Sequence, residues 1–185
     1  MSTRRTNLRN FSVSLLGLVA VGCSLFQEYA PPPCPEINLL GDASAITQFK
    51  KGPGRDPIDV FATARIKDVL AVCDVDVDES VGNGFISVKM NVIMDIQRGP
   101  ANKINRTLLK YFIGLTDQSG KIFKKKIFPV DVTFPGYRTR INLEDDPINI
   151  LVPVVNGDAQ KVFVGFQLSE KQLDYNRKLK AEGRF

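Results

Sequence analysis

The residues that could do chemistry in this chain are limited first by its composition. The 185-residue sequence contains no histidine and no tryptophan. Without histidine, Ser-His-Asp and Cys-His catalysis, histidine acid–base chemistry and most zinc sites are excluded. The lack of tryptophan removes the commonest strong platform for stacking a sugar ring. We therefore expect a protein without enzymatic activity and without a cofactor.

A run of acidic residues, DVDVDE at positions 74–79, is the first cluster to consider, because clustered carboxylates suit Ca²⁺. An EF-hand loop starting at Asp74 requires glycine at its sixth position and glutamate at its twelfth, where this chain has Glu79 and Phe85. Alternation of aspartate with valine is also typical of a strand with one solvated face. We therefore expect a solvated strand here and no metal site.

The segment KKGPGRD is a candidate anion site. It places Lys50, Lys51 and Arg55 around a glycine-rich bend, whose exposed N–H groups and cations could hold an anion such as a lipid phosphate. The segment is not a P-loop, because no Gly-Lys-Ser/Thr follows and the next element is a strand. A solvent-exposed connector is the alternative interpretation.

Three consecutive lysines, Lys124, Lys125 and Lys126, are a candidate surface contact. Lysines on an edge strand prevent edge-to-edge pairing with another sheet, which is the simpler interpretation. The functional alternative is electrostatic contact with an anionic membrane or glycan surface, where each cation contributes roughly 1 kcal/mol.

The N-terminal segment has the three-part layout of an export signal. Arg4, Arg5 and Arg9 precede an apolar run at 11–22, which is too short to cross a bilayer stably as a helix. Residues 20–23 (AVGC) resemble the lipobox of bacterial lipoproteins, with alanine where leucine is commoner. The resemblance implies that residues 1–22 are removed and that Cys23 becomes the lipid-bearing first residue. An ordinary secretory signal with an incidental cysteine is the alternative.

Removal of the signal changes the charge of the protein. The full chain carries 25 Lys and Arg against 20 Asp and Glu. Loss of three arginines and of no acid leaves 22 against 20, a net charge of +2. A general affinity for nucleic acid loses its main support, and we expect no nucleic-acid partner.

Two cysteines remain besides Cys23. Because an even number of cysteines is left in an exported protein, we predict a disulfide between Cys34 and Cys73. Cys73, Val75 and Val77 share one side of the expected strand, which we predict to be its buried face. Closing a loop of about 40 residues would stabilise the fold by roughly 3–4 kcal/mol. Two unpaired thiols are the alternative.

The mature chain divides into three expected parts. Residues 23–35 form a tether, in which four prolines favour an extended conformation reaching roughly 35–40 Å. Residues 36–168 form one β domain, and residues 169–185 form a C-terminal helix and tail. No stretch after the signal is long and apolar enough to span a membrane.

Alternation of apolar and polar residues predicts the strands. They lie at 59–77, 85–97, 106–116, 121–133, 137–143, 148–155 and 162–168. The phase of 59–77 slips near 67–69, which a β-bulge or a bend between two sheets would explain. Turns are expected at 82–84 (GNG), 117–120 (DQSG) and 156–157 (NG). The pattern predicts an all-β protein, an antiparallel immunoglobulin-like β-sandwich of about seven strands; a small barrel is the alternative.

The end of the chain has helical character instead. Ser169 and Gln172 form a capping box, which predicts a short polar helix over about 170–181. Its apolar stripe is thin, consisting of Leu173, Tyr175 and Leu179. The helix either lies loosely on the domain or docks onto another molecule.

Several segments together resemble a known group of proteins. They are the lipobox, PPPCP, ITQFKKGPGRD at 46–56, FPVDVTFP at 128–135 and VGFQLSEKQLDYNR at 164–177. These segments look like those of lipoproteins from alphaproteobacteria without an assigned activity. The resemblance covers nearly the whole mature chain and implies a location but no mechanism. Ser24 after the cysteine is usual in lipoproteins that pass to the outer membrane, with anchoring in the inner membrane as the alternative.

These observations favour a lipid-anchored, periplasm-facing protein that binds other envelope proteins as an accessory or structural subunit. Its contact with the membrane would be the N-terminal lipid. The rival hypothesis is a lipoprotein that holds an anionic lipid or glycan through Lys50, Lys51 and Arg55. An enzyme, the third alternative, would need a pair of acids in a cleft.

Overall fold

The computed structural model describes residues 32–78, 83–117, 119–155 and 158–184. The strands are β1 (Ile37–Leu39), β2 (Ala45–Phe49), β3 (Val60–Asp78), β4 (Asn83–Arg98), β5 (Arg106–Thr116), β6 (Ile122–Thr133), β7 (Arg140–Glu144), β8 (Ile148–Val155), β9 (Asp158–Ala159) and β10 (Lys161–Phe166). The helices are the 3₁₀ turns η1 (Gly41–Ala43) and η2 (Pro57–Asp59) and the helix α1 (Glu170–Ala181).

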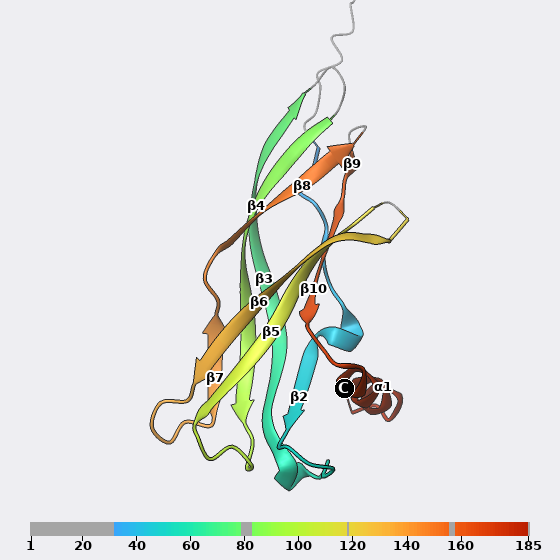
Figure 1. The fold of residues 1–185 in the computed structure, drawn as a ribbon. Coiled ribbons are helices and arrows are strands. Elements are labelled where there is room, and N and C mark those ends of the chain that lie inside the picture. The colour runs from blue at the N-terminus through green and yellow to red at the C-terminus, as the bar shows by residue number, and fades with distance from the viewer. Residues whose placement is uncertain (1–31, 79–82, 118, 156–157, 185) are drawn as a thin grey trace, which may run out of the picture.

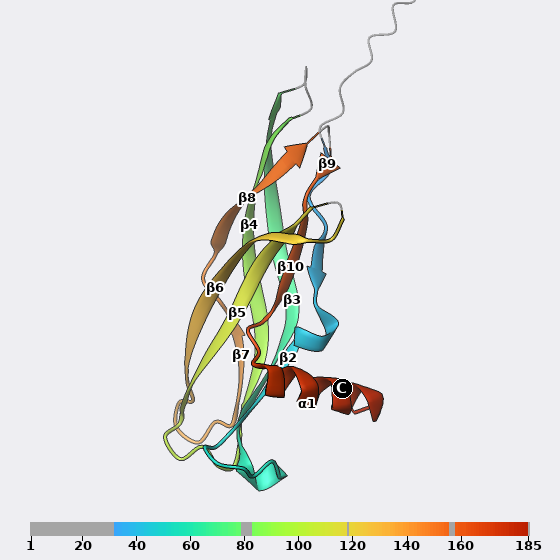
Figure 2. The same cartoon turned by 45° about the vertical axis from the view of Figure 1, so that its right-hand side comes forward.

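Two sheets pack face to face as a β-sandwich (Figures 1 and 2). The smaller sheet has the order β1-β10-β5-β6, and the larger has the order β2-β3-β4-β8-β9, with β7 also paired to β4. The pairs are antiparallel except that β1 runs parallel to β10. The expected all-β sandwich with one short C-terminal helix is confirmed, while the immunoglobulin-like arrangement stays a prediction.

Strand β4 lies at the centre of the larger sheet, between β3 and the two strands β7 and β8. Its inward side chains have an exposed fraction of 0%; they are Ile86, Val88, Met90, Val92, Met94 and Ile96. They share one core with the inward residues of the smaller sheet, among them Leu109, Tyr111, Val162 and Val164. The alternation expected for this strand is therefore confirmed.

The phase slip in the preceding strand is a β-bulge. Ile66 of β3 pairs with Met94, and Asp68 pairs with Ile93, so that Lys67 is the extra residue. A bulge changes which residues face the core, because side chains alternate across a strand. The prediction of an irregularity at 67–69 is confirmed, and its cause is the bulge.

One expected strand starts later than predicted. Tyr137 is fully exposed, and β7 begins only at Arg140. The reason is a turn, in which Arg138 N–H donates to the carbonyl of Pro135 and Gly136 adopts a φ of +57°. The prediction of a strand from residue 137 was wrong, because this turn occupies its first residues. Ile141 and Leu143 do lie on the core side, half-buried.

The turns were predicted with mixed success. The turn at 117–120 is confirmed, since Gly120 N–H donates to the carbonyl of Asp117. The turn at 82–84 was placed too late, because Asn83 and Gly84 already pair with Asp78 and Val77 in the β3–β4 ladder. Residues 156–157 lie outside the described residues.

The sandwich is long because β3 and β4 are long. Strand β3 has 19 residues and therefore extends over roughly 60 Å. The described chain begins near the tip of the β3–β4 hairpin, whereas η2 and α1 lie toward the other end (Figures 1 and 2). No helix among the described residues is long and apolar enough to cross a membrane.

Candidate functional site

The predicted lipidation residue, Cys23, lies outside the described residues. The predicted disulfide is present and joins Cys34 to Cys73, with their Cα atoms 5.9 Å apart. Pro32 and Pro35 are both buried, so the last residues of the expected tether pack onto the domain. The entering chain is thereby fixed to β3.

The buried face predicted for Cys73, Val75 and Val77 of β3 is found only at Cys73, and the side chain of Val77 lies outside the described residues. Cys73 packs half-buried against the core, while Asp74 and Asp76 are exposed. Val75, which pairs with Ile86 near the end of the β3–β4 ladder, is 36% exposed. Among the described residues, no group of three or more His, Cys, Asp or Glu is placed to hold a metal ion.

The loop KKGPGRD is organised around a buried carboxylate. Asp59 is 5% exposed, and it accepts a hydrogen bond from Asp56 N–H while its other oxygen lies 2.6 Å from Lys50 Nζ. The hydrogen bond from Lys50 lowers the pKa of Asp59 against the opposing effect of burial. A Cβ atom on Gly54 would lie only 2.2 Å from Asp59 Oδ2. The glycine therefore makes room for this carboxylate.

Arg55 fixes the same loop from the outside. Its guanidinium donates to the carbonyls of Gly52 and Gly54, and it lies 5.1 Å from the centre of the Phe49 ring. Arg55 thus faces carbonyl oxygens of its own loop. Lys51 is exposed and forms no hydrogen bond or ion pair within the described residues.

Two of the three predicted cations line a common hollow. Lys50 and Arg55 form one side of a cavity of about 580 Å³ between the loop and α1. Its other lining residues are Thr47, Phe49, Ser169, Lys171, Gln172, Asp174, Tyr175 and Lys178. Phe49 and Tyr175 meet edge to face, with ring centres 5.3 Å apart. The hollow therefore joins two aromatic rings with four cations.

Helix α1 is held against the free edge of β2. Among the described strands β2 pairs with β3 on one side only, so the carbonyls of Ala45 and Thr47 face away from the sheet. The Asn176 amide donates to the Ala45 carbonyl at 2.8 Å, and the Gln172 amide donates to the Thr47 carbonyl at 3.5 Å. One helical turn separates the two donors, which matches the spacing of alternate residues along a strand.

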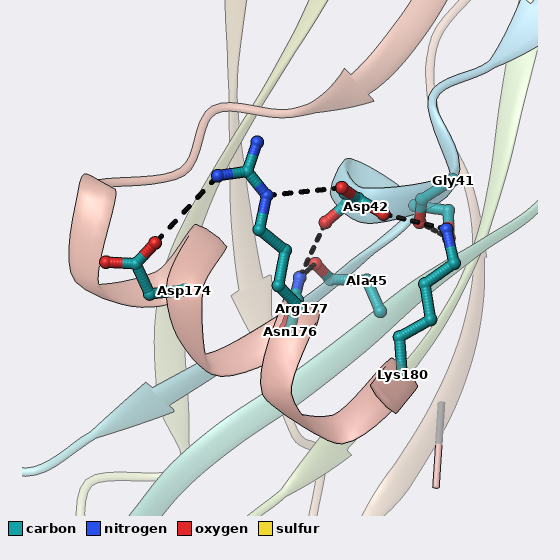
Figure 3. Close-up of polar contacts among 8 residues, drawn as sticks. Gly41, Asp42, Ala45, Asp174, Asn176, Arg177 and Lys180 are labelled. Carbon is teal, nitrogen blue, oxygen red and sulfur yellow. Dashed lines mark hydrogen bonds and ion pairs between the residues drawn. The ribbon is translucent and has the colours of Figure 1, made fainter. Parts of the chain in front are cut away.

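An ion-pair cluster fixes the C-terminal half of the helix (Figure 3). Lys180 Nζ lies 2.9 Å and Arg177 Nε 3.3 Å from the carboxylate of Asp42 in η1. Asn176, which is 2% exposed, donates a second hydrogen bond to the Asp42 carbonyl. Hydrogen bonds from Lys180 and then Arg177 lower the pKa of Asp42. The helix is therefore docked on this domain by polar contacts.

No protein-family model matches this chain. Neither the curated proteins nor the solved structures contain a match to it. The resemblance to alphaproteobacterial lipoproteins therefore stays a prediction from the sequence.

The three lysines at 124–126 lie on β6, which is an edge strand of the smaller sheet. Lys125 Nζ lies 4.0 Å from the centre of the Phe112 ring, and Lys126 Nζ lies 5.1 Å from that of Phe128. Lys124 is exposed. This placement fits the interpretation that the lysines protect a free strand edge.

A buried phenol bridges the two sheets. Tyr111 of β5 is 0% exposed and donates from its hydroxyl to Asp145 Oδ2 at 2.7 Å, in the break between β7 and β8. Burial, followed by the contact with Asp145, raises the pKa of Tyr111 well above its ordinary value. A phenol held neutral in the core suits a structural role, because a general acid or base needs a pKa near the working pH.

Sequence reasoning missed the part that α1 plays in the hollow. The helix had a detectable signal, since Lys171, Asp174, Tyr175 and Lys178 recur at intervals of three or four residues and so share one face. The spacing does not identify the segment that this helix face lies against, because the loop at 50–55 is more than a hundred residues away in the chain.

Proposed function

We propose that this chain is a lipoprotein of the bacterial envelope, anchored through a lipid on Cys23. It faces the periplasm and acts by binding an envelope partner, without catalysis. The export-signal layout and the sequence AVGC at 20–23 support the anchor. Ser24 favours the outer membrane over the inner membrane by resemblance to other lipoproteins.

The disulfide supports an exported protein. Structural disulfides persist in oxidising compartments such as the periplasm and are rare in the cytosol. The bond between Cys34 and Cys73 leaves Cys23 as the one cysteine outside it, since the sequence contains three. That remaining thiol is the one that the lipobox resemblance assigns to the lipid.

The single observation that carries the proposal is where this disulfide attaches the chain. Cys34 follows the expected anchor by eleven residues and is bonded to β3 thirteen residues beyond Val60. Thirteen strand residues extend over about 40 Å. An anchor at Cys23 would therefore hold the Cys73 end of β3 toward the membrane and leave the loop at 50–55 about 40 Å farther out. Helix α1, which binds Ala45 opposite Arg65, would lie about 25 Å or more farther out.

Burial of Pro32 shortens the free part of the tether. Only residues 24–31 lie between Cys23 and Pro32. Eight residues in an extended conformation reach roughly 25 Å, compared with 35–40 Å for the whole Pro-rich segment. The tether would thus hold the domain close to the lipid headgroups, while the end of the domain with the loop at 50–55 points into the periplasm. A protein arranged in this way is suited to presenting a surface to a partner.

Photo-crosslinking in intact cells tests this function. A photo-reactive residue replaces Lys171 at the far end, and Lys89, an exposed lysine on β4, is the matched control position. We expect a reproducible envelope adduct from position 171, little from position 89, and release of the protein from membranes by Cys23→Ala. Membrane-bound protein that gives no adduct at position 171 would count against partner binding.

One observation favours the second candidate function, binding of an anionic lipid or glycan. Lys50 and Arg55 line the same hollow as two lysines of α1. Native mass spectrometry of protein taken from membranes should then detect a bound molecule. A spectrum with the protein's own mass alone would argue against this candidate.

A further inference from the structure

The hollow beside α1 carries an unbalanced positive charge. Lys50, Arg55, Lys171 and Lys178 line it, against the single acid Asp174. Lys171 and Lys178 form no ion pair within the described part of the chain. Lys50 pairs with Asp59, yet its side chain is still 53% exposed. Clustered cations in a concave surface concentrate anionic ligands.

The same hollow has an apolar floor. The rings of Phe49 and Tyr175 are half-buried, so each keeps part of its surface accessible. Arg55 lies over the Phe49 ring, which places a guanidinium next to an aromatic face. Ligand sites combine apolar and aromatic surface with a few polar groups that fix orientation. A ligand whose ring has C–H groups on its face and carries an acidic substituent would fit this combination of aromatic surface and cations.

The hollow continues along the helix. A second hollow, of about 590 Å³, shares Arg55, Tyr175 and Lys178 with the first and adds Arg184 and Glu182. A third, of about 390 Å³, shares Arg184 with the second. It is lined on the outer face of the larger sheet by Arg65, Lys67, Asp95, Gln97 and Arg140. Successive hollows that share walls and are mainly basic fit a chain of repeated anionic units better than one small ion.

Two other anionic partners fit less well. An extended acidic peptide commonly adds a strand to a free sheet edge, but the outward carbonyls of Ala45 and Thr47 in β2 already accept from Asn176 and Gln172. The protein's own membrane is distant from the first hollow, because Lys50 and Arg55 lie near the Val60 end of β3, about 40 Å along the strand from Cys73. The third hollow, at Arg65 and Lys67, lies about 20–25 Å along the strand from Cys73.

We propose that this basic–aromatic groove, the three hollows along α1, binds an anionic glycan. The ligand is a chain of sugars that bears carboxylate or phosphate groups. Sugar rings lie against Phe49 and Tyr175, while Arg55, Lys171 and Lys178 bind the acidic groups. This inference rests on the second candidate function proposed above, the binding of an anionic lipid or glycan, and commits it to a glycan.

Binding is measured in solution on the purified full chain, so the result does not depend on whether Cys23 carries lipid. The probes are an oligogalacturonate of about ten sugars, which bears carboxylates, and a phosphomannan, which bears phosphates. Neutral dextran, poly-glutamate and phosphatidylglycerol vesicles are the comparison ligands. We expect saturable binding to at least one anionic glycan, weakened at least about tenfold by 0.5 M salt.

The test variant is Lys171→Glu with Lys178→Glu, because neither lysine forms an ion pair with another described residue. We expect binding to weaken by about tenfold or more, and the double substitution to glutamine to have an intermediate effect. The matched control is Lys124→Glu with Lys126→Glu, which makes the same charge change on β6. Far-UV circular dichroism and thermal melting check that each variant is folded.

The outcomes separate the alternatives. Binding of oligogalacturonate or phosphomannan that only the α1 variant loses supports the proposal and identifies the acidic group. Equal loss in both variants overturns it, because net charge alone would then explain binding. Tighter binding to poly-glutamate or to the vesicles overturns it in favour of an acidic protein or a lipid surface. Failure to bind either anionic glycan, or equal binding to dextran, also overturns it.

Discussion

The side-chain amide of Asn176 in α1 donates to the backbone carbonyl of Ala45 in β2 at 2.8 Å. This contact occupies a strand edge that has no other strand beside it in the described part of the chain. Free edges invite pairing with other chains, and covering them with a helix is one way to prevent it. Docking of α1 therefore protects the larger sheet and also builds the wall of the basic–aromatic groove.

Asn176→Ala should loosen the helix. The substitution removes two hydrogen bonds, to the carbonyls of Ala45 and Asp42, from a side chain that is 2% exposed. Leaving these partly buried carbonyls without donors costs roughly 1–3 kcal/mol. Hydrogen exchange should become faster across α1 and β2, while exchange in β4 changes little. Lys171→Ala is the control, and an unchanged helix in the Asn176 variant would contradict the docking described here.

Acid should undock the same helix. Lys180 and Arg177 lower the pKa of Asp42 below its ordinary value of 3.8. A lowered pKa in the folded state means that the stabilisation is complete above pH 3.8 and is lost as the pH falls through the lowered pKa. Nuclear magnetic resonance of the Phe49–Tyr175 contact between pH 6 and 2 follows this change. The Asp42→Asn variant should lose most of this dependence; retaining all of it would assign the effect to another group.

Removal of the disulfide should destabilise the domain. Cys34 and Cys73 close a loop with a sequence separation of 39 residues, for which chain entropy gives about 4 kcal/mol. Urea unfolding of the Cys34→Ser, Cys73→Ser variant should therefore have a lower midpoint than the oxidised protein. Reductant should lower the midpoint of the wild type and leave that of the variant unchanged. Equal stability of oxidised and reduced protein would exclude a structural role for the bond.

The buried phenol predicts an alkaline limit to stability. Burial and Asp145 raise the pKa of Tyr111 above its ordinary value of 10.0. The stabilisation is therefore complete below pH 10 and is lost as the pH rises above it, because the unfolded state releases the proton first. Tyr111→Phe should cost roughly 1–3 kcal/mol at neutral pH. It should also reduce the decline in stability above pH 10, and a decline as steep as that of the wild type would contradict this assignment.

The parts of the fold that the sequence predicts are those with local signals. The alternation in β4, the bulge at Lys67 and the capping box of Ser169 with Gln172 each depend on neighbouring residues, and the structure has all three. Strand β2 was missed, because its five residues are too few for a clear alternation. The turn after Pro135 was read as strand, since its alternating side chains resemble one.

The groove could be predicted only in part, for a related reason. Lys50 and Arg55 stand out in the sequence as cations beside glycines. Their neighbours Tyr175 and Lys178 come from the C-terminal helix, and they are brought there by hydrogen bonds to backbone carbonyls of β2. Backbone carbonyls are the same in every residue, so no residue type marks where a helix will dock.

Labelling with palmitate in intact cells tests the central claim, anchoring through Cys23, most directly. The wild-type protein should incorporate the label and stay with the membranes, and Cys23→Ala should lose both. The Cys34→Ser, Cys73→Ser variant is the matched control and should keep the label, because its disulfide cysteines carry no lipid. Label that persists in Cys23→Ala, or a wild-type protein that takes up none, would contradict the claim.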